Sequence, residues 1–382
     1  MTKDTKINLL NIVLMLLSCV AAFIMPFEVF LFAYAVLGPL HYLTEISWLH
    51  DRQYFAKGKY DFLILLVIGI VLSLWDFSIY YHWWPYDTAE NREMASSWNI
   101  YEKLLFIAFF SGIIVAFVKN YLLKIVGIAL VFFLALRIYG QLYNAQLDEG
   151  GKEGILTMLL TSFVPTLIHV YVFTGFFMLF GALKSRSVAG IWSVVVLVIC
   201  PLLLFFLFTD KSFIPVTAYG KEAYGDALSG NGFFGLNKEI LSGFLNKQIG
   251  EVPASIISNE QYRNFYNAEW SQLVFHSQAG VIVTRFIAFA YTYHYLNWFS
   301  KTEVIRWHKV PKMRFVAVII IWLISLGLYA YNYKVGLQWL FFLSFTHVLL
   351  EFPLNFISIV GIGKELTTIA KKGFKPTTLA QP

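Results

Sequence analysis

The chain has 382 residues, of which 58% are hydrophobic, 18% aromatic and only 14% charged. A typical soluble domain has roughly 25% charged residues, so this composition excludes an ordinary soluble protein. The formal net charge is +6, and the basic residues fall at the ends of apolar runs, which indicates membrane topology and not nucleic-acid binding.

Apolar runs long enough to cross a bilayer recur along the whole length. They predict an all-α, polytopic transmembrane helical bundle of about ten spans. The predicted spans are 8–25, 28–48, 60–82, 101–118, 121–139, 155–183, 188–209, 271–298, 313–331 and 336–361. The first seven spans thus occupy residues 1–209, and the last three occupy 271–362. No small-residue cleavage site follows the first run, so we expect a transmembrane helix there and not a cleaved signal peptide.

The distribution of basic residues predicts the orientation of the bundle. Ten spans put both termini on one side of the membrane. Eighteen Lys and Arg residues then lie on that side and nine on the other, and most of the nine lie in one long loop that has little influence on topology. The loops 85–100 and 140–154, on the second side, carry acidic residues. Both termini are therefore predicted to be cytoplasmic.

Two segments lie outside the predicted spans. Residues 210–270 form the largest polar segment and are predicted to be an extracytoplasmic loop. Within it, residues 233–245 place apolar side chains at helical spacing, which predicts a helix that lies on the membrane surface or packs on the bundle. Residues 363–382 are basic and are expected to form a cytoplasmic tail that is disordered or apposed to the membrane.

Two predicted spans each carry a histidine and a glutamate four residues apart, His41 with Glu45 and His347 with Glu351. Four residues are about one helical turn, so both side chains of a pair lie on one face. A glutamate at membrane depth is costly unless something binds or neutralises it. Two such pairs, far apart in sequence, predict one buried polar site assembled from several helices.

Two more spans contribute a histidine at a similar predicted depth, near the middle or inner half of the bilayer. Imidazole together with carboxylate suits iron, zinc or manganese. The four candidate metal ligands are His41, His169, His294 and His347. Glu45 and Glu351 are candidate catalytic residues, which would orient the imidazoles, ligate the metal directly or move protons.

The same residues allow other interpretations. A single buried histidine is more often a core residue hydrogen-bonded across helices, and two facing histidines can hold a haem. Buried His, Glu, Asp and Arg can also form a proton or ion pathway in a transporter, and Pro39 and Pro353 interrupt the two motif spans as in many transporters. Walker, Gly-x-Ser-x-Gly, paired CxxC and His-Glu-x-x-His motifs are missing. The other ionisable residues within predicted spans, expected to face the bundle interior, are Asp76, Arg137 and Arg285.

Residues 38–45, GPLHYLTE, resemble the first signature of the Brp/Blh family of membrane β-carotene cleavage dioxygenases, a Gly–Pro–His run followed by an acidic residue. In this chain Leu40 separates the proline from the histidine. The resemblance implies a polytopic enzyme that holds iron with histidines from several helices and splits a carotenoid with O₂ to give retinal. The four candidate histidines would then be the iron ligands.

Taken together, the residues and the resemblance lead us to expect an integral membrane, metal-dependent enzyme. The expected cofactor is iron, and the expected reaction is oxygenation of a lipid or an isoprenoid such as a carotenoid. The expected partners are membrane lipid and an apolar small-molecule substrate, with no nucleic acid. The alternative is a transporter that uses the buried ionisable residues for proton or ion coupling.

Overall fold

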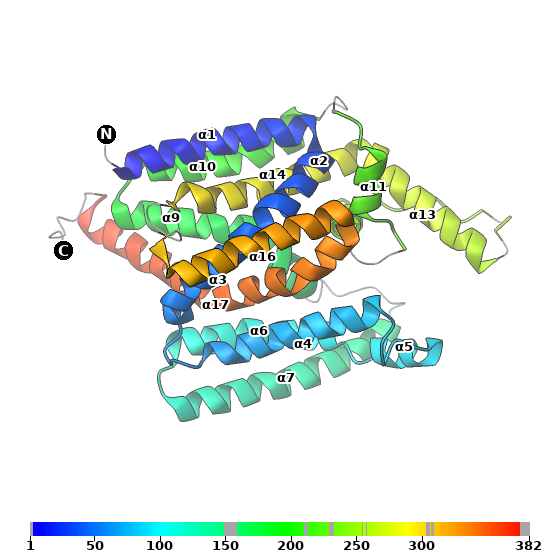
Figure 1. Cartoon of the computed structure of the whole chain (residues 1–382), viewed down its shortest axis with the longest axis horizontal. Coiled ribbons are helices and arrows are strands. Elements are labelled where there is room, and N and C mark those ends of the chain that lie inside the picture. The colour runs from blue at the N-terminus through cyan, green and yellow to red at the C-terminus, as the bar shows by residue number, and fades with distance from the viewer. Residues whose placement is uncertain are drawn as a thin grey trace. The chain divides into compact units, whose positions relative to one another are not determined.

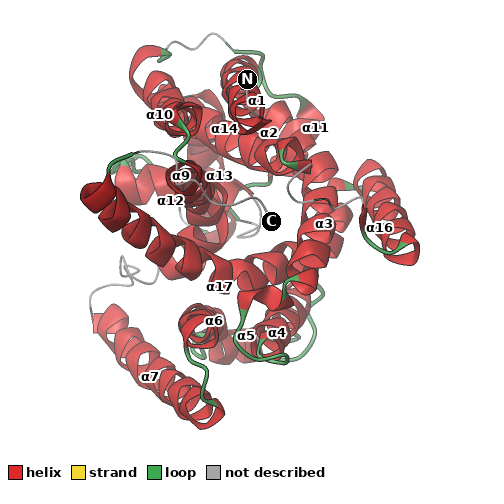
Figure 2. Ribbon diagram, turned by 90° about the vertical axis from the view of Figure 1, so that its left-hand side faces the viewer, coloured by secondary structure: helices red, strands yellow, loops and turns green. Residues whose placement is uncertain are grey.

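The computed structural model describes residues 3–148, 159–209, 213–228, 233–253, 255–256, 258–302, 306 and 309–374. All regular elements in these ranges are helices joined by loops (Figure 2). Nine of the described helices are long and apolar enough to cross a membrane, or ten spans exist if one bent pair counts as a single span. The predicted all-α bundle of about ten spans is therefore confirmed.

The helices group into two compact units that interleave along the sequence. Unit 1 consists of Met1–Gly38 and Ser187–Lys301, and unit 2 consists of Pro39–Arg186 and Thr302–Pro382. This grouping by packing differs from the predicted grouping by position along the chain, because early, middle and late helices pack together.

Unit 1 is built around α14, which packs against α1 and α2, while α1 also packs against α10 (Figure 1). Its helices are α1 (Lys3–Ile24), α2 (Pro26–Phe32), η1 (Ala33–Leu37), α10 (Val188–Leu202), η4 (Leu203–Leu207), α11 (Ala218–Tyr224), α12 (Phe233–Glu239), η5 (Ile240–Phe244), α13 (Asn259–His276) and α14 (Gln278–Ser300). Aromatic rings fill its core. Phe30, for example, meets Phe233 edge-on with ring centroids 4.4 Å apart and Tyr291 at 5.1 Å.

Unit 2 is built around α17, which packs against α4, α6, α9 and α16 (Figure 1). Its helices are α3 (Gly38–Asp51, of which Gly38 itself belongs to unit 1), η2 (Gln53–Phe55), α4 (Phe62–Tyr80), α5 (Ala89–Ser96), α6 (Ile100–Phe117), α7 (Tyr121–Asp148), η3 (Leu159–Phe173), α9 (Thr174–Ser185), α16 (Lys312–Tyr331) and α17 (Tyr333–Lys372). Close packing of α6 on α17 depends on Gly112, where an added Cβ would lie 2.8 Å from the Cβ of Phe352.

The predicted span 271–298 is not one straight helix. Helix α13 ends at His276, α14 begins at Gln278, and the two are bent by 64°. Ser277 accepts a hydrogen bond from the backbone N–H of Gly280 at 2.9 Å, which is the usual way in which a serine begins a new helix. A Cβ at Gly280 would lie 2.2 Å from the carbonyl oxygen of Leu273, so the bend requires a residue without a side chain there.

The structure also describes parts of the two segments outside the predicted spans. The segment 233–245 forms the short helix α12 followed by a π-helical turn. Its apolar side chains are buried in unit 1, namely Phe233, Leu236, Ile240 and Leu241. Of the two predicted arrangements, the segment therefore adopts the helix packed on the bundle. The tail is helical as far as Lys372, because residues 364–372 are mostly good helix formers that extend α17. Residues 375–382 lie outside the described part of the chain.

The expectation for Arg137 needs correction, because its side chain does not face the interior. Its side chain is exposed on α7, and the guanidinium carbon lies over the ring of Phe133, 5.3 Å from the centroid. A long basic side chain can lie along an apolar surface and keep its charged end near the membrane boundary. Arg285 and Asp76, by contrast, are buried as expected, at 0% and 8% exposure.

Candidate metal centre

Five of the six predicted site residues lie together inside unit 2. His41 and Glu45 are on α3, His169 is on η3, and His347 and Glu351 are on α17. Each of the five side chains is between 1% and 3% exposed. The three histidines offer ligand nitrogens that all lie within 4.8 Å of one another. The predicted buried polar site is therefore present in unit 2, with histidines from three separate helices.

Local sequence explains how two of these helices present their side chains. On α3 the four-residue spacing brings His41 Nε2 to 3.0 Å from Glu45 Oε2, as helical geometry predicts. His169 lies in a π-helix that also contains Pro165. Proline lacks a backbone N–H and clashes with the carbonyl four residues before it, so it favours a wider turn. Wide π-helical turns are frequent at functional sites.

Each histidine has one ring nitrogen close to an oxygen that can accept its proton. Glu45 approaches His41 Nε2 at 3.0 Å, and Glu351 approaches His169 Nδ1 at 3.0 Å. His347 Nδ1 lies 3.3 Å from the backbone carbonyl oxygen of Leu343. Oxygen acceptors of this kind hold metal-binding imidazoles in one orientation and one tautomer.

The other nitrogens of two histidines face each other, with His169 Nε2 and His347 Nε2 only 3.1 Å apart. A carbonyl oxygen can only accept a hydrogen bond, so His347 Nδ1 carries the proton and its Nε2 carries a lone pair. An ionised Glu351, 3.0 Å away, likewise favours a proton on Nδ1 of His169. In that protonation state the two Nε2 lone pairs would repel each other at 3.1 Å, and a positive ion between them would relieve the repulsion.

The third histidine decides between a proton and a metal ion. A shared proton satisfies two nitrogens, whereas a metal ion can satisfy three or more. On His41, Glu45 engages Nε2, so Nδ1 is the nitrogen that a metal would bind. The donor set of three imidazoles, each supported by an oxygen acceptor, therefore fits a metal ion better than it fits a hydrogen-bond network alone.

The charges of the cluster also fit a divalent cation. Glu45 and Glu351 lie close enough for each to influence the charge of the other. Two buried carboxylates this close repel when both are ionised, and burying either one without compensation is costly. An ion of charge +2 among neutral imidazoles would balance both carboxylates. Such a site carries no net charge, which suits its depth in a membrane.

One aromatic residue of the site was not predicted. The ring of Tyr42 stacks on the ring of His347, with centroids 4.1 Å apart and an angle of 27° between the planes. Tyr42 is 2% exposed and directly follows His41 in the sequence. It holds the His347 imidazole in place from the side. In the sequence, only its position next to the candidate ligand His41 could have indicated that Tyr42 belongs to the site.

The remaining buried ionisable residues have other surroundings. Arg285, in unit 1, donates from Nε to the carbonyl of Phe23 at 3.1 Å and from a terminal nitrogen to the carbonyl of Phe208 at 2.7 Å. It thus caps the ends of α1 and η4. His294, also in unit 1, lies on α14, is 7% exposed and has its ring next to that of Tyr295. Its role as a fourth metal ligand stays a prediction.

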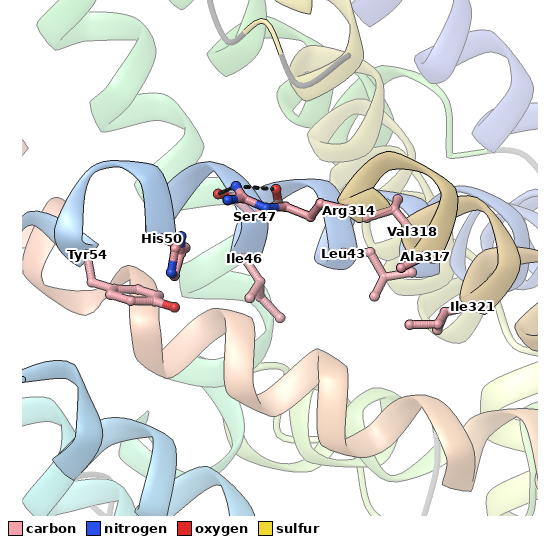
Figure 3. Close-up of a pocket in the computed structure, with 9 residues that line it drawn as sticks. All are labelled: Leu43, Ile46, Ser47, His50, Tyr54, Arg314, Ala317, Val318 and Ile321. Atoms are coloured by element: carbon pink, nitrogen blue, oxygen red, sulfur yellow. Dashed lines mark hydrogen bonds between the residues drawn. The ribbon is translucent and has the colours of Figure 1, made fainter. Parts of the chain in front are cut away.

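A pocket of about 310 Å³ lies between α3 and α16 in unit 2 (Figure 3). Residues lining it from α3 include Leu43, Ile46 and His50. His50 follows His41 by nine residues, which is two and a half helical turns, so the pocket side of α3 is opposite to the side that carries His41. Arg314 reaches across from α16 to the Oγ of Ser47 at 3.3 Å. The pocket is therefore separate from the histidine cluster.

No protein-family profile matches this chain, and no curated protein and no solved structure is significantly similar to it.

Proposed function

We propose that this protein is an iron-dependent membrane oxygenase acting on a lipid or an isoprenoid. The observation that carries the proposal is the pair of imidazole nitrogens, His169 Nε2 and His347 Nε2, that face each other at 3.1 Å while Glu351 and the Leu343 carbonyl engage the opposite ring nitrogens. His41 supplies a third donor beside them. A bound cation is the simplest way to stabilise this arrangement.

Iron is proposed over other metals for two reasons. A site of a few histidines with nearby carboxylates suits iron, and three protein ligands leave coordination positions for other molecules. The resemblance of residues 38–45 to Brp/Blh dioxygenases, which hold iron with histidines, supports the same choice. When bound, iron would supply the activation of O₂.

The roles proposed for the protein's own residues follow from their contacts. Glu45 and Glu351 would fix the tautomers of His41 and His169 and offset the charge of the ion. Tyr42 would keep the His347 ring in the orientation that presents Nε2. The substrate is proposed to be apolar because the cluster lies inside helices long and apolar enough to cross a membrane.

Metal analysis of the purified protein tests the proposal. The protein is purified in detergent from cells grown with added iron, its metals are quantified by mass spectrometry, and its visible spectrum is recorded. We expect close to one iron per chain and no haem Soret band. Replacing His169 or His347 with alanine should abolish the bound iron. The matched control is His50→Ala, because the side chain of His50 is 60% exposed at the end of the same helix as His41.

Three outcomes would overturn the proposal. A haem spectrum would replace non-haem iron with a different cofactor. A wild-type protein that neither retains nor binds any transition metal on titration would remove the cofactor altogether. Equal iron content in His169→Ala, His347→Ala and the His50→Ala control would place the metal elsewhere. The variant His294→Ala tests separately whether a fourth histidine contributes.

Transport is the second candidate, and one observation favours it. Asp76 on α4 is 8% exposed and lies next to Gln338 on α17, but its Oδ2 atom has no hydrogen-bond partner among the described residues. A carboxylate buried in a span and only partly satisfied is typical of proton and ion pathways. Proteoliposomes with a pH-sensitive dye inside test this candidate. Proton uptake that Asp76→Asn abolishes, in a protein without bound metal, would favour transport over the oxygenase.

A further inference from the structure

The polar face of α17 continues beyond the histidine cluster. After Glu351, the same side of the helix presents Asn355, Ser358 and Glu365, at spacings of four, three and seven residues. Asn355 and Ser358 are each only 1% exposed. The distance along the helix from Glu351 to Glu365 is about 21 Å at 1.5 Å per residue. A polar stripe therefore runs from the cluster to the part of α17 predicted to be cytoplasmic.

The middle of this stripe is buried but not satisfied by the protein. Neither the Oδ1 nor the Nδ2 atom of Asn355 has a hydrogen-bond partner in the described chain, and neither has the Oγ atom of Ser358. A buried serine on a helix usually bonds back to the carbonyl four residues earlier, as Ser325 does on α16 and Ser73 on α4, both at 2.8 Å. Ser358 does not do this. Its hydroxyl therefore needs a partner from outside the described chain.

Water is the hydrogen-bond partner that best fits these atoms. A buried amide and a buried hydroxyl without partners are expensive, and buried polar groups of this kind are usually bonded to ordered water. An amide offers both donors and an acceptor, and a hydroxyl offers both as well, so either can bind water in any orientation. A metal cation would leave the Nδ2 group of Asn355 unsatisfied, because that group can only donate a hydrogen bond.

Polar contacts close the stripe at both ends. At one end, Glu351 lies 3.0 Å from Nδ1 of His169, which is on η3. At the other, Glu365 forms an ion pair of 2.8 Å with Arg186, which follows directly after α9. Because α9 continues from η3 and α17 packs against both, the two helical segments run alongside each other between these contacts. Glu365 is 25% exposed, so this end reaches the surface.

We propose that Asn355 and Ser358 hold a file of internal water molecules that connects Glu351 with the Arg186–Glu365 pair, where Glu365 is partly exposed. This passage lies wholly within unit 2 and does not depend on which metal, if any, the histidines bind. It gives the cluster a polar connection to the predicted cytoplasmic surface, separate from any apolar route taken by a substrate. Water and protons would exchange with the cluster along it.

Cysteine accessibility tests the passage directly. The two native cysteines, Cys19 and Cys200, are first replaced by alanine to remove the background. Ser358→Cys then places a thiol in the passage, and Leu350→Cys places one on the same helix at the same 1% exposure but off the polar stripe. Both are treated with a small charged methanethiosulfonate, which modifies thiolates reached by water, and the modified fraction is followed by mass spectrometry.

We expect Ser358→Cys to react at least about tenfold faster than Leu350→Cys, because a thiolate forms only where water is present. Adding Asn355→Leu to Ser358→Cys should slow the reaction, because the apolar side chain interrupts the water file. Thermal unfolding confirms that each variant is folded before it is labelled. Equal rates for the two cysteines, whether both slow or both fast, would overturn the proposal. So would an Asn355→Leu substitution that leaves the rate unchanged. Iron content, measured in parallel, reports on the metal site independently.

Discussion

The carboxylate of Glu351 offers the sharpest test of the metal centre, through the substitution Glu351→Gln. The change preserves size and shape but removes the charge that lies 3.0 Å from His169 Nδ1. Losing a residue that orients a metal-binding imidazole typically lowers metal affinity by about 10- to 100-fold. That range corresponds to about 1.4–2.8 kcal/mol of binding free energy.

The same substitution should have the opposite effect on the protein without metal. Glu351 is 3% exposed and lies close to Glu45, so two ionised carboxylates repel each other when no cation balances them. Replacing one with a neutral amide relieves that repulsion. We therefore expect Glu351→Gln to raise the apparent unfolding temperature of the metal-free protein and to lower that of the metal-loaded protein.

Two measurements check this pair of expectations. Competition with a chelator gives the metal affinity, and thermal unfolding in detergent with and without metal gives the two stabilities. Glu365→Gln is the matched control, since it lies on the same helix but pairs with Arg186 at the far end. Its metal affinity should equal that of the unmodified protein. If Glu351→Gln lowered the unfolding temperature equally with and without metal, the residue would be structural and the reasoning about charge would be wrong.

Two predictions concern stability. Lys124 Nζ lies 2.5 Å from Asp61 Oδ2, and the two side chains are 5% and 6% exposed. Lys124→Met removes the positive charge beside a buried carboxylate and should lower the free energy of unfolding by about 3–5 kcal/mol. Adding Asp61→Asn should recover part of this stability in a thermal unfolding assay, and no recovery would show that the charge is not the cause. Gly112→Ala should lower the unfolding temperature because its Cβ would lie 2.8 Å from that of Phe352, whereas Gly327→Ala, with no atom within 4 Å, should leave it unchanged or raise it.

Hydropathy predicted most of the fold because transmembrane helices need long apolar runs, and those runs are visible in any sequence. It did not predict the break at Ser277. The two helices on either side of Ser277 are together long and apolar enough to be read as one membrane span. Only the serine, followed three residues later by a glycine, marks the start of a second helix. Arg137 was misplaced for a related reason, since hydropathy does not say which side of a helix faces lipid.

The contacts within one helix were predictable, and those between helices were not. His41 and Glu45 meet at 3.0 Å because helical spacing brings them together. His347 and Glu351 have the same spacing, yet Glu351 contacts His169 on another helix and His347 bonds to a backbone carbonyl. Rotation of α17 about its own axis decides between these pairings, and periodicity contains no information about that rotation. The π-helix that carries His169 was not predicted either, because apolar periodicity does not distinguish a π-helical segment from an α-helix.

The order in which this chain is synthesised has a consequence for the histidine cluster. Glu45 leaves the ribosome about 300 residues before Glu351, which at roughly 5–20 residues per second is about 15–60 seconds. During that interval α3 has neither α17 beside it nor the His347 side chain that completes the cluster. During that time, water, lipid headgroups or a chaperone would have to stabilise the carboxylate of Glu45, because its later partners in the cluster are not yet made. A chain that ends before Tyr333 would keep this exposed state permanently, and cellular quality control could recognise it.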